Sequence, residues 1–225
     1  MNLSVSNSEL FTCRCEYLKA LFSSCIYPWE MLPKLKEYIA SLISDGIPEF
    51  EPMGNIVLVG KDAVIHPSAV IKPYTIIGKG CELRPGAYIR GNVITGSNCV
   101  IGNSCEVKNS ILLDDVHIPH YNYVGDSVLG NRAHMGAGAV CSNLKSDGSC
   151  VVIHTNPPIR TDIRKIGGIL ADGADVGCGC VLNPGTVVGK NTRVYPLTSM
   201  RGVYPPDSIV KSNHNICKIQ NHPKT

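Results

Sequence analysis

The sequence has 225 residues, a formal net charge of +3 and 6% aromatic residues. The charge is too small and the aromatic rings are too few for a typical nucleic-acid-binding protein, which favours a small anionic molecule as the partner. The length is sufficient for one or two domains with a buried core.

The first part of the chain, residues 1–54, is predicted to be helical. Apolar residues recur there at helical spacing, and Pro28 is well placed to begin a helix. Two short helices are expected, near residues 9–22 and 29–43. We expect this segment to cover the open end of the fold that follows, because a bare terminal coil leaves backbone groups unpaired; a dedicated binding module is the alternative.

The N-terminal residues show no secretory signal. They lack a basic head and a long apolar stretch, and no apolar run long enough for a membrane helix occurs anywhere in the sequence. A cytoplasmic protein without a membrane-spanning segment is therefore expected.

From residue 65 onwards the sequence repeats every six residues. An aliphatic residue occupies the repeated position in all but one case, and a mostly small residue follows four positions later. The repeated positions are Ile65, Ile71, Ile77, Leu83, Ile89, Thr95, Ile101, Val107 and Leu113. This period is typical of a parallel β-helix, in which three hexads make one triangular coil and residues eighteen apart stack at about 4.8 Å.

The same register returns between residues 170 and 194, so the β-helix is predicted to span residues 55–213. It is interrupted between residues 141 and 169, where the register disappears and a long excursion is expected. A smaller slip in the register is expected between residues 119 and 129. Residues 214–225 are predicted to form a C-terminal tail.

The sequence contains eleven cysteines, which we interpret as reduced structural thiols. Several of them fall on the small inward positions of the repeat: Cys81, Cys99, Cys105 and Cys180. The pairs at residues 13 and 15 and at residues 178 and 180 lack the spacing of a zinc site, so no metal is expected.

The eighteen-residue period predicts that Arg90 and Lys108 lie one above the other on one face. Two cations about 4.8 Å apart repel each other unless an anion or a carboxylate lies between them. A bound phosphate would relieve this repulsion. The alternative is neutralisation of Arg90 by Glu106 from the neighbouring coil or by an acidic residue of another subunit.

Four blocks between residues 83 and 143 resemble a known enzyme family. They are LRPGA at 83–87, NSCEVK at 103–108, HYNYVGD at 120–126 and MGAG at 135–138. In this order they are similar to the acetyltransferase half of the bacterial bifunctional enzyme that acetylates glucosamine-1-phosphate and then uridylylates it. The nucleotidyltransferase half, with its Gly-rich N-terminal signature, has no counterpart in this sequence, and the whole chain further resembles stand-alone relatives of that enzyme. The resemblance implies a left-handed β-helix, a homotrimer with active sites at subunit interfaces, and acetyl-CoA as the donor.

The resemblance implies that His120 is the catalytic base. The unperturbed pKa of histidine, near 6.5, suits a proton acceptor at neutral pH. A histidine on the surface or in an interface is the alternative reading, and His134 is the next candidate for the base.

The resemblance also implies sites for the two substrates. Arg84, Lys108 and Tyr123 fall on family positions that hold the sugar phosphate, and Arg90 joins them through its stack with Lys108; for Lys108 a solvated surface position is the alternative. His134 stands where the family has asparagine, which leaves the acceptor open. The CoA positions are those of Ala137, Cys178 and Pro196, where contacts are largely through the backbone. Lys145 and Lys165 are unassigned candidates for a further phosphate contact.

These observations favour a CoA-dependent acyltransferase that acetylates the amine of an amino-sugar phosphate or of a nucleotide-linked amino sugar. Such a reaction needs a neutral amine, a base and donors for the oxyanion. A non-catalytic β-helix that scaffolds or binds sugar nucleotides is the second hypothesis, because fold does not fix function. A γ-class carbonic anhydrase is the third, but His117 and His120 do not have the spacing of its zinc ligands.

Overall fold

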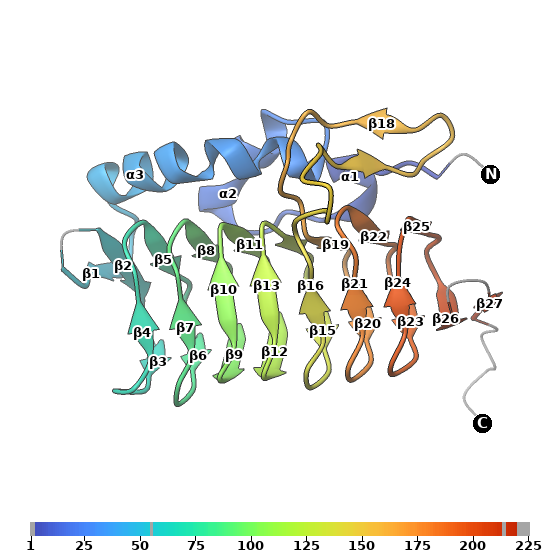
Figure 1. Cartoon of the computed structure of the whole chain (residues 1–225). Coiled ribbons are helices and arrows are strands. Elements are labelled where there is room, and N and C mark those ends of the chain that lie inside the picture. The colour runs from blue at the N-terminus through green and yellow to red at the C-terminus, as the bar shows by residue number, and fades with distance from the viewer. Residues whose placement is uncertain (1–2, 55, 213–214, 220–225) are drawn as a thin grey trace, which may run out of the picture.

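The computed structural model describes residues 3–54, 56–212 and 215–219. In this part of the chain three β-sheets form the three faces of a triangular prism, which we name faces A, B and C (Figure 1). Neighbouring strands of the stacked coils run parallel, and each turn of the chain adds one strand to each face. The predicted fold class, a left-handed parallel β-helix with a short helical N-terminal region, is confirmed.

The strands of each face follow one another along the prism. Face A contains β1 (Phe50–Pro52), β2 (Val57–Gly60), β5 (Thr75–Ile77), β8 (Val93–Thr95), β11 (Ser110–Leu112), β14 (Val128–Leu129), β19 (Gly168–Leu170), β22 (Thr186–Val188) and β25 (Val203–Tyr204). Face B contains β3 (Val64–Ile65), β6 (Glu82–Leu83), β9 (Val100–Asn103), β12 (His117–His120), β15 (His134–Met135), β20 (Asp175–Val176), β23 (Arg193–Val194), β26 (Ser208–Ser212) and β27 (Asn215–Lys218). Face C contains β4 (Val70–Ile71), β7 (Tyr88–Ile89), β10 (Glu106–Lys108), β13 (Tyr123–Gly125), β16 (Val140–Cys141), β21 (Val181–Leu182) and β24 (Ser199–Met200).

The prism encloses a core of aliphatic and small side chains. The repeated positions supply fully buried residues such as Leu83, Ile101 and Val107. The small positions supply buried cysteines such as Cys99, Cys105 and Cys180, and burial raises the pKa of the Cys105 and Cys180 thiols. A protonated thiol packs as a small apolar group, which fits the structural role predicted for these residues.

The coils become one residue shorter at an earlier point in the sequence than the slip predicted between residues 119 and 129. Ile76 pairs with Ile94, eighteen residues on, whereas Ile94 pairs with Ile111, only seventeen residues on. Val107 still pairs with Ile89, so the lost residue lies in the turn from face C to face A after β10. As a result Leu112 enters the prism core, and the expectation that Leu113 points inward is wrong.

The helices lie along face A, on the outside of the prism (Figure 1). They are α1 (Asn7–Leu10), α2 (Glu16–Ser23), the 3₁₀ helices η1 (Pro28–Glu30) and η2 (Leu32–Lys34), and α3 (Leu35–Asp45). Buried helix residues such as Trp29 and Leu35 share one cluster with the outward-facing Ile76, Ile94 and Ile111 of face A. The prediction that this segment covers the open end of the β-helix is therefore wrong. It covers face A instead, because the outer side of face A is itself aliphatic.

At each end of the described coils an antiparallel strand pairs with the outermost parallel strand of one face. β1 pairs with β2 on face A at the N-terminal end, and β27 pairs with β26 on face B at the other end. Of the tail predicted over residues 214–225, residues 214 and 220–225 lie outside the described residues. Among the described residues no helix is long and apolar enough to cross a membrane.

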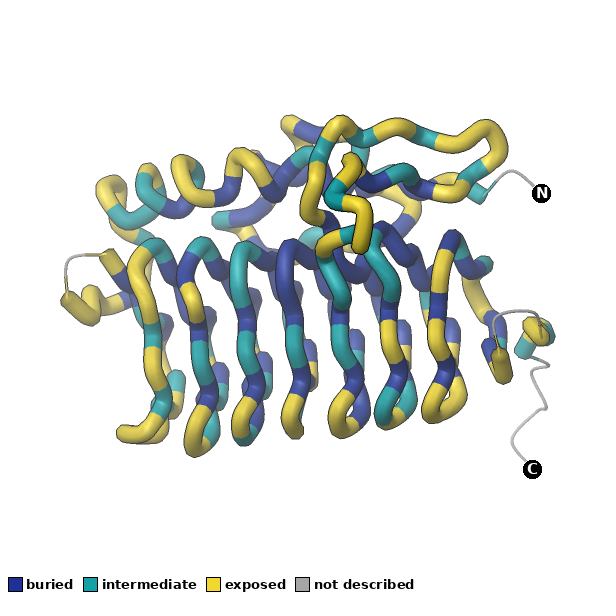
Figure 2. The backbone as a smooth tube through the Cα atoms, in the orientation of Figure 1, coloured by how far each residue is buried: buried dark blue, intermediate teal, exposed yellow. Residues whose placement is uncertain are grey.

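The chain leaves the β-helix after β16 and rejoins it at β19 (Figures 1 and 2). We name residues 142–167 the excursion. It contains an antiparallel hairpin of β17 (Val152–Ile153) and β18 (Ile159–Arg160). Val151, Ile153 and Ile166 are fully buried in the cluster that also holds the helices, so the excursion is anchored to the body of the protein.

Candidate active site

His120 lies at the corner between faces B and C, where β12 ends. Its backbone N–H donates a hydrogen bond to Asn122 Oδ1 at 3.1 Å. The buried Asn122 amide in turn donates to the carbonyls of Gly136 at 2.8 Å and Ala139 at 3.0 Å on the next coil. Asn122 therefore ties two coils together and fixes the backbone from which the imidazole of His120 projects.

Backbone hydrogen bonds join this corner to the same corner of the following coils. The N–H of Gly138 donates to the carbonyl of His120 at 3.0 Å, and that of Gly179 donates to Ala137 at 2.8 Å. One coil further, the N–H of Leu197, next to Pro196, donates to Cys178 at 2.9 Å. His120, Ala137, Cys178 and Pro196 thus form one line along the corner, all four exposed, with steps of about 4.8 Å. We name this line the corner ladder.

His134 lies on face B rather than at this corner. It pairs in register with His117 of β12 and with Asp175 of β20. Its Nδ1 lies 2.8 Å from Asp175 Oδ1. The imidazole of His120, by contrast, has no hydrogen-bond partner within the residues that the structure describes, so it is open to a substrate.

Lys108 and Tyr123 belong to one hydrogen-bonded network on face C. Lys108 Nζ lies 3.0 Å from Asp126 Oδ2, and Asp126 is only 4% exposed. Asn143 donates to the same carboxylate and, at 3.2 Å, to the hydroxyl of Tyr123. Asn109 donates to the second oxygen of Asp126 at 2.7 Å. The buried carboxylate is the centre of the network.

Arg90 and Lys108 occupy the same position of successive coils, because Ile89 and Val107 pair in register. Each cation has its own carboxylate, since Arg90 forms an ion pair with Glu106, the alternative that the sequence had left open. The stack alone therefore does not require a bound anion.

Arg84 follows β6 on face B, away from the column of Arg90 and Lys108 on face C. Two hydrogen bonds join its guanidinium to Glu82, at 3.0 and 3.1 Å. The structure thus separates Arg84 from the other two cations within one chain.

Three residues of this region were not predicted from the sequence: Asn122, Asp126 and Asn143. Asp126 could have been found, because it follows Lys108 by the same eighteen residues that separate Lys108 from Arg90. Asn122 also left a signal, since it stands four positions after the inward-facing Ile118, where other coils have a small residue. Asn143 gave no comparable signal because it lies just past the end of the regular repeat.

The described residues contain no group of three or more His, Cys, Asp or Glu side chains arranged to hold a metal ion. His117 and His120, which prompted the carbonic anhydrase hypothesis, lie on the same strand of face B.

Comparison with known families identifies the repeat. A model of the bacterial transferase hexapeptide, six repeats long, matches residues 56–91, and a model of the GMPPB C-terminal domain matches residues 81–163. The chain thus carries the bacterial transferase hexapeptide repeat, followed by a segment similar to the GMPPB C-terminal domain. The two matches together cover the first coils, the corner with His120 and most of the excursion.

Relatives of this hexapeptide-repeat protein include longer bifunctional proteins. The bifunctional protein GlmU of Methanococcus maripaludis is 31% identical over 180 residues, which is 79% of this chain and 44% of that protein. A bifunctional sugar-1-phosphate nucleotidylyltransferase/acetyltransferase of Sulfurisphaera tokodaii is 32% identical over 88 residues, 39% of this chain and 22% of that protein. The chain thus spans less than half the length of either relative.

Among solved structures, a hexapeptide transferase family protein from Anaplasma phagocytophilum has the same fold. Its TM-score is 0.50 at 16% identity, over 78% of this chain and 87% of that chain. At this identity the likeness concerns the fold alone.

Proposed function

We propose that this protein is a CoA-dependent N-acetyltransferase that acts on an amino-sugar phosphate or a nucleotide-linked amino sugar, with His120 as the general base. The observation that carries the proposal is the corner ladder, in which His120 lies in line with Ala137, Cys178 and Pro196. These are the positions at which the resemblance implies the base and the CoA contacts. A CoA thioester lying along the ladder would bring its acetyl group to His120.

The reaction is a direct transfer. The neutral amine of the acceptor attacks the thioester carbonyl carbon, and His120 takes the proton from the amine nitrogen. The C–S bond then breaks, and the departing CoA sulfur takes up a proton to leave as the thiol. No covalent acyl-enzyme is needed. A positioned base of this kind contributes about 10²–10⁴-fold to the rate.

For the acceptor we propose Arg84, Lys108 and Tyr123 as contacts, with Arg90 and His134 at the edge of the site. The side chain of Lys108 is still 24% exposed beside its carboxylate, so its remaining donors can reach a ligand. Arg84 lies on face B and Lys108 on face C of one chain. One acceptor molecule can contact both side chains most readily when they belong to two subunits that face each other.

We therefore propose a homotrimer with the corner between faces B and C directed towards the neighbouring subunits. The helices occupy face A, which leaves faces B and C for association. At the shared corner Tyr121 is 64% exposed and Leu197 is 84% exposed, which is unusual for large apolar residues. We place this trimer in the cytoplasm.

A non-catalytic protein that binds sugar nucleotides is the second candidate. The pairing of Arg84, Arg90 and Lys108 with carboxylates favours it, because these cations already have partners within the chain. A phosphate would have to compete with those carboxylates.

Release of free thiol from acetyl-CoA, measured with a panel of amino-sugar phosphates and nucleotide-linked amino sugars, separates the two candidates. The acetyltransferase releases thiol only when a suitable acceptor is present. The scaffold releases none, and thermal unfolding then shows stabilisation by a sugar nucleotide but not by CoA.

A further inference from the structure

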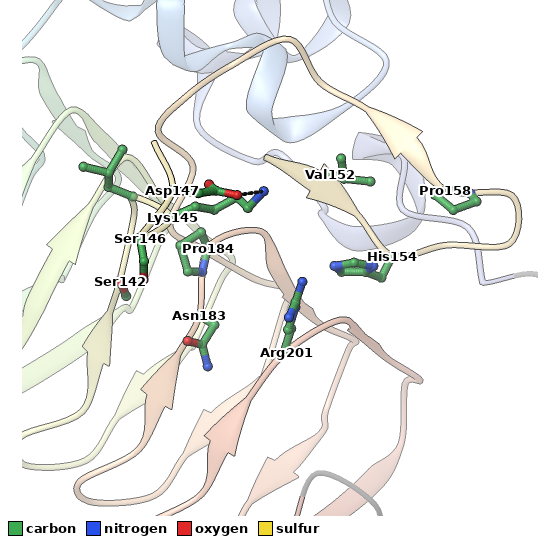
Figure 3. A pocket seen from close by; sticks show the side chains of 11 residues that line it. Ser142, Lys145, Ser146, Asp147, Val152, His154, Pro158, Asn183, Pro184 and Arg201 are labelled. Carbon is green, nitrogen blue, oxygen red and sulfur yellow. Dashed lines mark ion pairs between the residues drawn. The ribbon is translucent and has the colours of Figure 1, made fainter. Parts of the chain in front are cut away.

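A cavity of about 610 Å³ lies between face C and the excursion, apart from the corner ladder (Figure 3). Ser142, Asn183 and Arg201 form its floor, and Lys145, Asp147 and His154 contribute from the excursion. Nothing in the reaction proposed above uses this space. Its volume is that of a pocket for a small organic ligand, which ranges from about 300 to 1,000 Å³.

The floor continues the column of cations on face C. Cys141, Leu182 and Met200 pair in register, so the residues that follow them, Ser142, Asn183 and Arg201, occupy one position of three successive coils. The pairings of β10 with β13 and of β13 with β16 place this position in line with Lys108. After Arg90 and Lys108 the column therefore continues with Gly125, the hydrogen-bonding Ser142 and Asn183, and then a further cation, Arg201.

The excursion is held firmly over this floor. A Cβ atom added to Gly185 would lie 2.6 Å from Val151 and 3.0 Å from Ile153, so the hairpin packs directly on the coil at this glycine. A Cβ atom added to Gly202 would lie 3.9 Å from the Cβ atom of His154, so His154 lies beside this glycine. These contacts hold the imidazole of His154 beside the side chain of Arg201 (Figure 3).

The lining of the cavity is basic. Lys145, His154 and Arg201 line it with one carboxylate, that of Asp147, which lies 3.4 Å from Lys145 Nζ. Burial and then the positive charges of Arg201 and Lys145 lower the pKa of His154. The three basic side chains therefore face one cavity, whose lining holds the hydrogen-bond donors that a phosphate needs.

We propose that this cavity is a second anion site, which binds the phosphate of a phosphorylated small molecule between Arg201, Lys145 and His154. Ser142 and Asn183 line the floor beside it, and the fixed fork of a guanidinium matches two phosphate oxygens. The volume exceeds what inorganic phosphate needs, so the phosphate belongs to a larger molecule. Its source is either CoA, through the 3′-phosphate, or a nucleotide, through its phosphate chain.

Binding measurements by titration calorimetry test this site without requiring turnover. The probes are inorganic phosphate, ADP, CoA and 3′-dephospho-CoA, and the variants are Arg201→Gln and Lys145→Gln. The matched control is Arg193→Gln, which removes an exposed arginine from face B of the same coil. We expect each test variant to weaken binding of a phosphorylated probe by roughly 10- to 100-fold, the loss of one or two charge-assisted hydrogen bonds, and the control to bind as the wild type does.

The probes identify the source of the phosphate. Weaker binding of CoA, with 3′-dephospho-CoA unaffected, assigns the site to the CoA 3′-phosphate. Weaker binding of ADP, with both forms of CoA unaffected, assigns it to a nucleotide. Unchanged binding of every probe by both test variants overturns the proposal, as does an equal loss in the Arg193 control.

Thermal unfolding of each variant shows whether it is folded. If Arg201→Gln is unstable, Lys145→Gln, on the excursion, provides the binding test instead. Because His120 lies outside the cavity, a loss of acetyl transfer and a loss of phosphate binding in the cavity are detected by separate measurements.

Discussion

Lys108 and Asp126, eighteen positions apart in the sequence, form an ion pair between neighbouring coils, with Nζ 3.0 Å from Oδ2. The Asp126 side chain is nearly buried, whereas the side chain of Lys108 is partly exposed. A buried carboxylate that loses its charged partner is costly, even when amide donors remain. Lys108 therefore has a structural role in addition to the proposed contact with the acceptor.

Replacement of Lys108 by Ala tests this double role. We expect the free energy of unfolding to fall by about 1–3 kcal/mol, because Asp126 keeps only the amides of Asn109 and Asn143. The acceptor KM should also rise, while the KM for acetyl-CoA stays unchanged. Arg90→Ala is the matched control, since its more exposed ion pair is screened by solvent and should contribute much less to stability. Equal losses of stability in the two variants, measured by urea unfolding, would contradict the structural role.

Asn122 is expected to position His120. Asn122→Ala removes the acceptor of the His120 N–H and the donor to two buried carbonyls, so it should lower stability by about 2–4 kcal/mol and reduce kcat. Asn131→Ala is the control, because Asn131 makes comparable buried hydrogen bonds to Thr12 and Asp172, away from the corner ladder. We expect it to cost similar stability and to leave kcat unchanged. A matching fall in kcat would show that the effect is general loosening of the coils.

The proposed trimer depends on the corner between faces B and C. Light scattering should give a particle of three chains for the wild type and smaller particles for Leu197→Glu, because a carboxylate would be placed in the interface. Ile26→Glu is the control, since Ile26 is 66% exposed in the N-terminal segment rather than at this corner. A wild-type monomer at micromolar concentration would exclude a site shared between subunits.

The helices should contribute directly to the stability of the β-helix. Trp29 is buried and stacks on Tyr27 with ring centroids 4.8 Å apart, in the cluster that covers face A. Trp29→Ala is expected to lower the free energy of unfolding by about 3–5 kcal/mol in one cooperative transition. A separate early transition, with the β-helix unfolding as in the wild type, would show that the helices are a detachable segment.

The inward positions of the β-helix could be predicted because each hexad provides one aliphatic residue in a strict period. The period also placed Lys108 above Arg90, since both precede the first shortened turn. The shortened turn itself could not be located. Residues 112 and 113 are both leucine, so the pattern is satisfied whether or not one residue is lost before them.

The position of the helices could not be derived from their own sequences. An amphipathic helix shows that it needs an apolar partner but not which surface provides one. The signal lay in the β-helix, where Ile76, Ile94 and Ile111 follow one another on the outer side of face A. The carboxylate partners of Arg84 and Lys108 were not predicted for a similar reason. Glu82 is found only when residues close to Arg84 in the sequence are considered, and Asp126 only when the stacking of the coils is considered.

The central claim is acetyl transfer with His120 as the base, and the rate of thiol release by His120→Ala tests it most directly. His120 is exposed at its corner, so the substitution should leave no cavity in the core. With an acceptor that the wild type uses, we predict a loss of about 10²–10⁴-fold in kcat with assembly and CoA affinity unchanged. His134→Ala, measured beside it, should retain most of the activity. A fully active His120→Ala variant, or a wild type that releases no thiol with any amino-sugar acceptor, would contradict the claim.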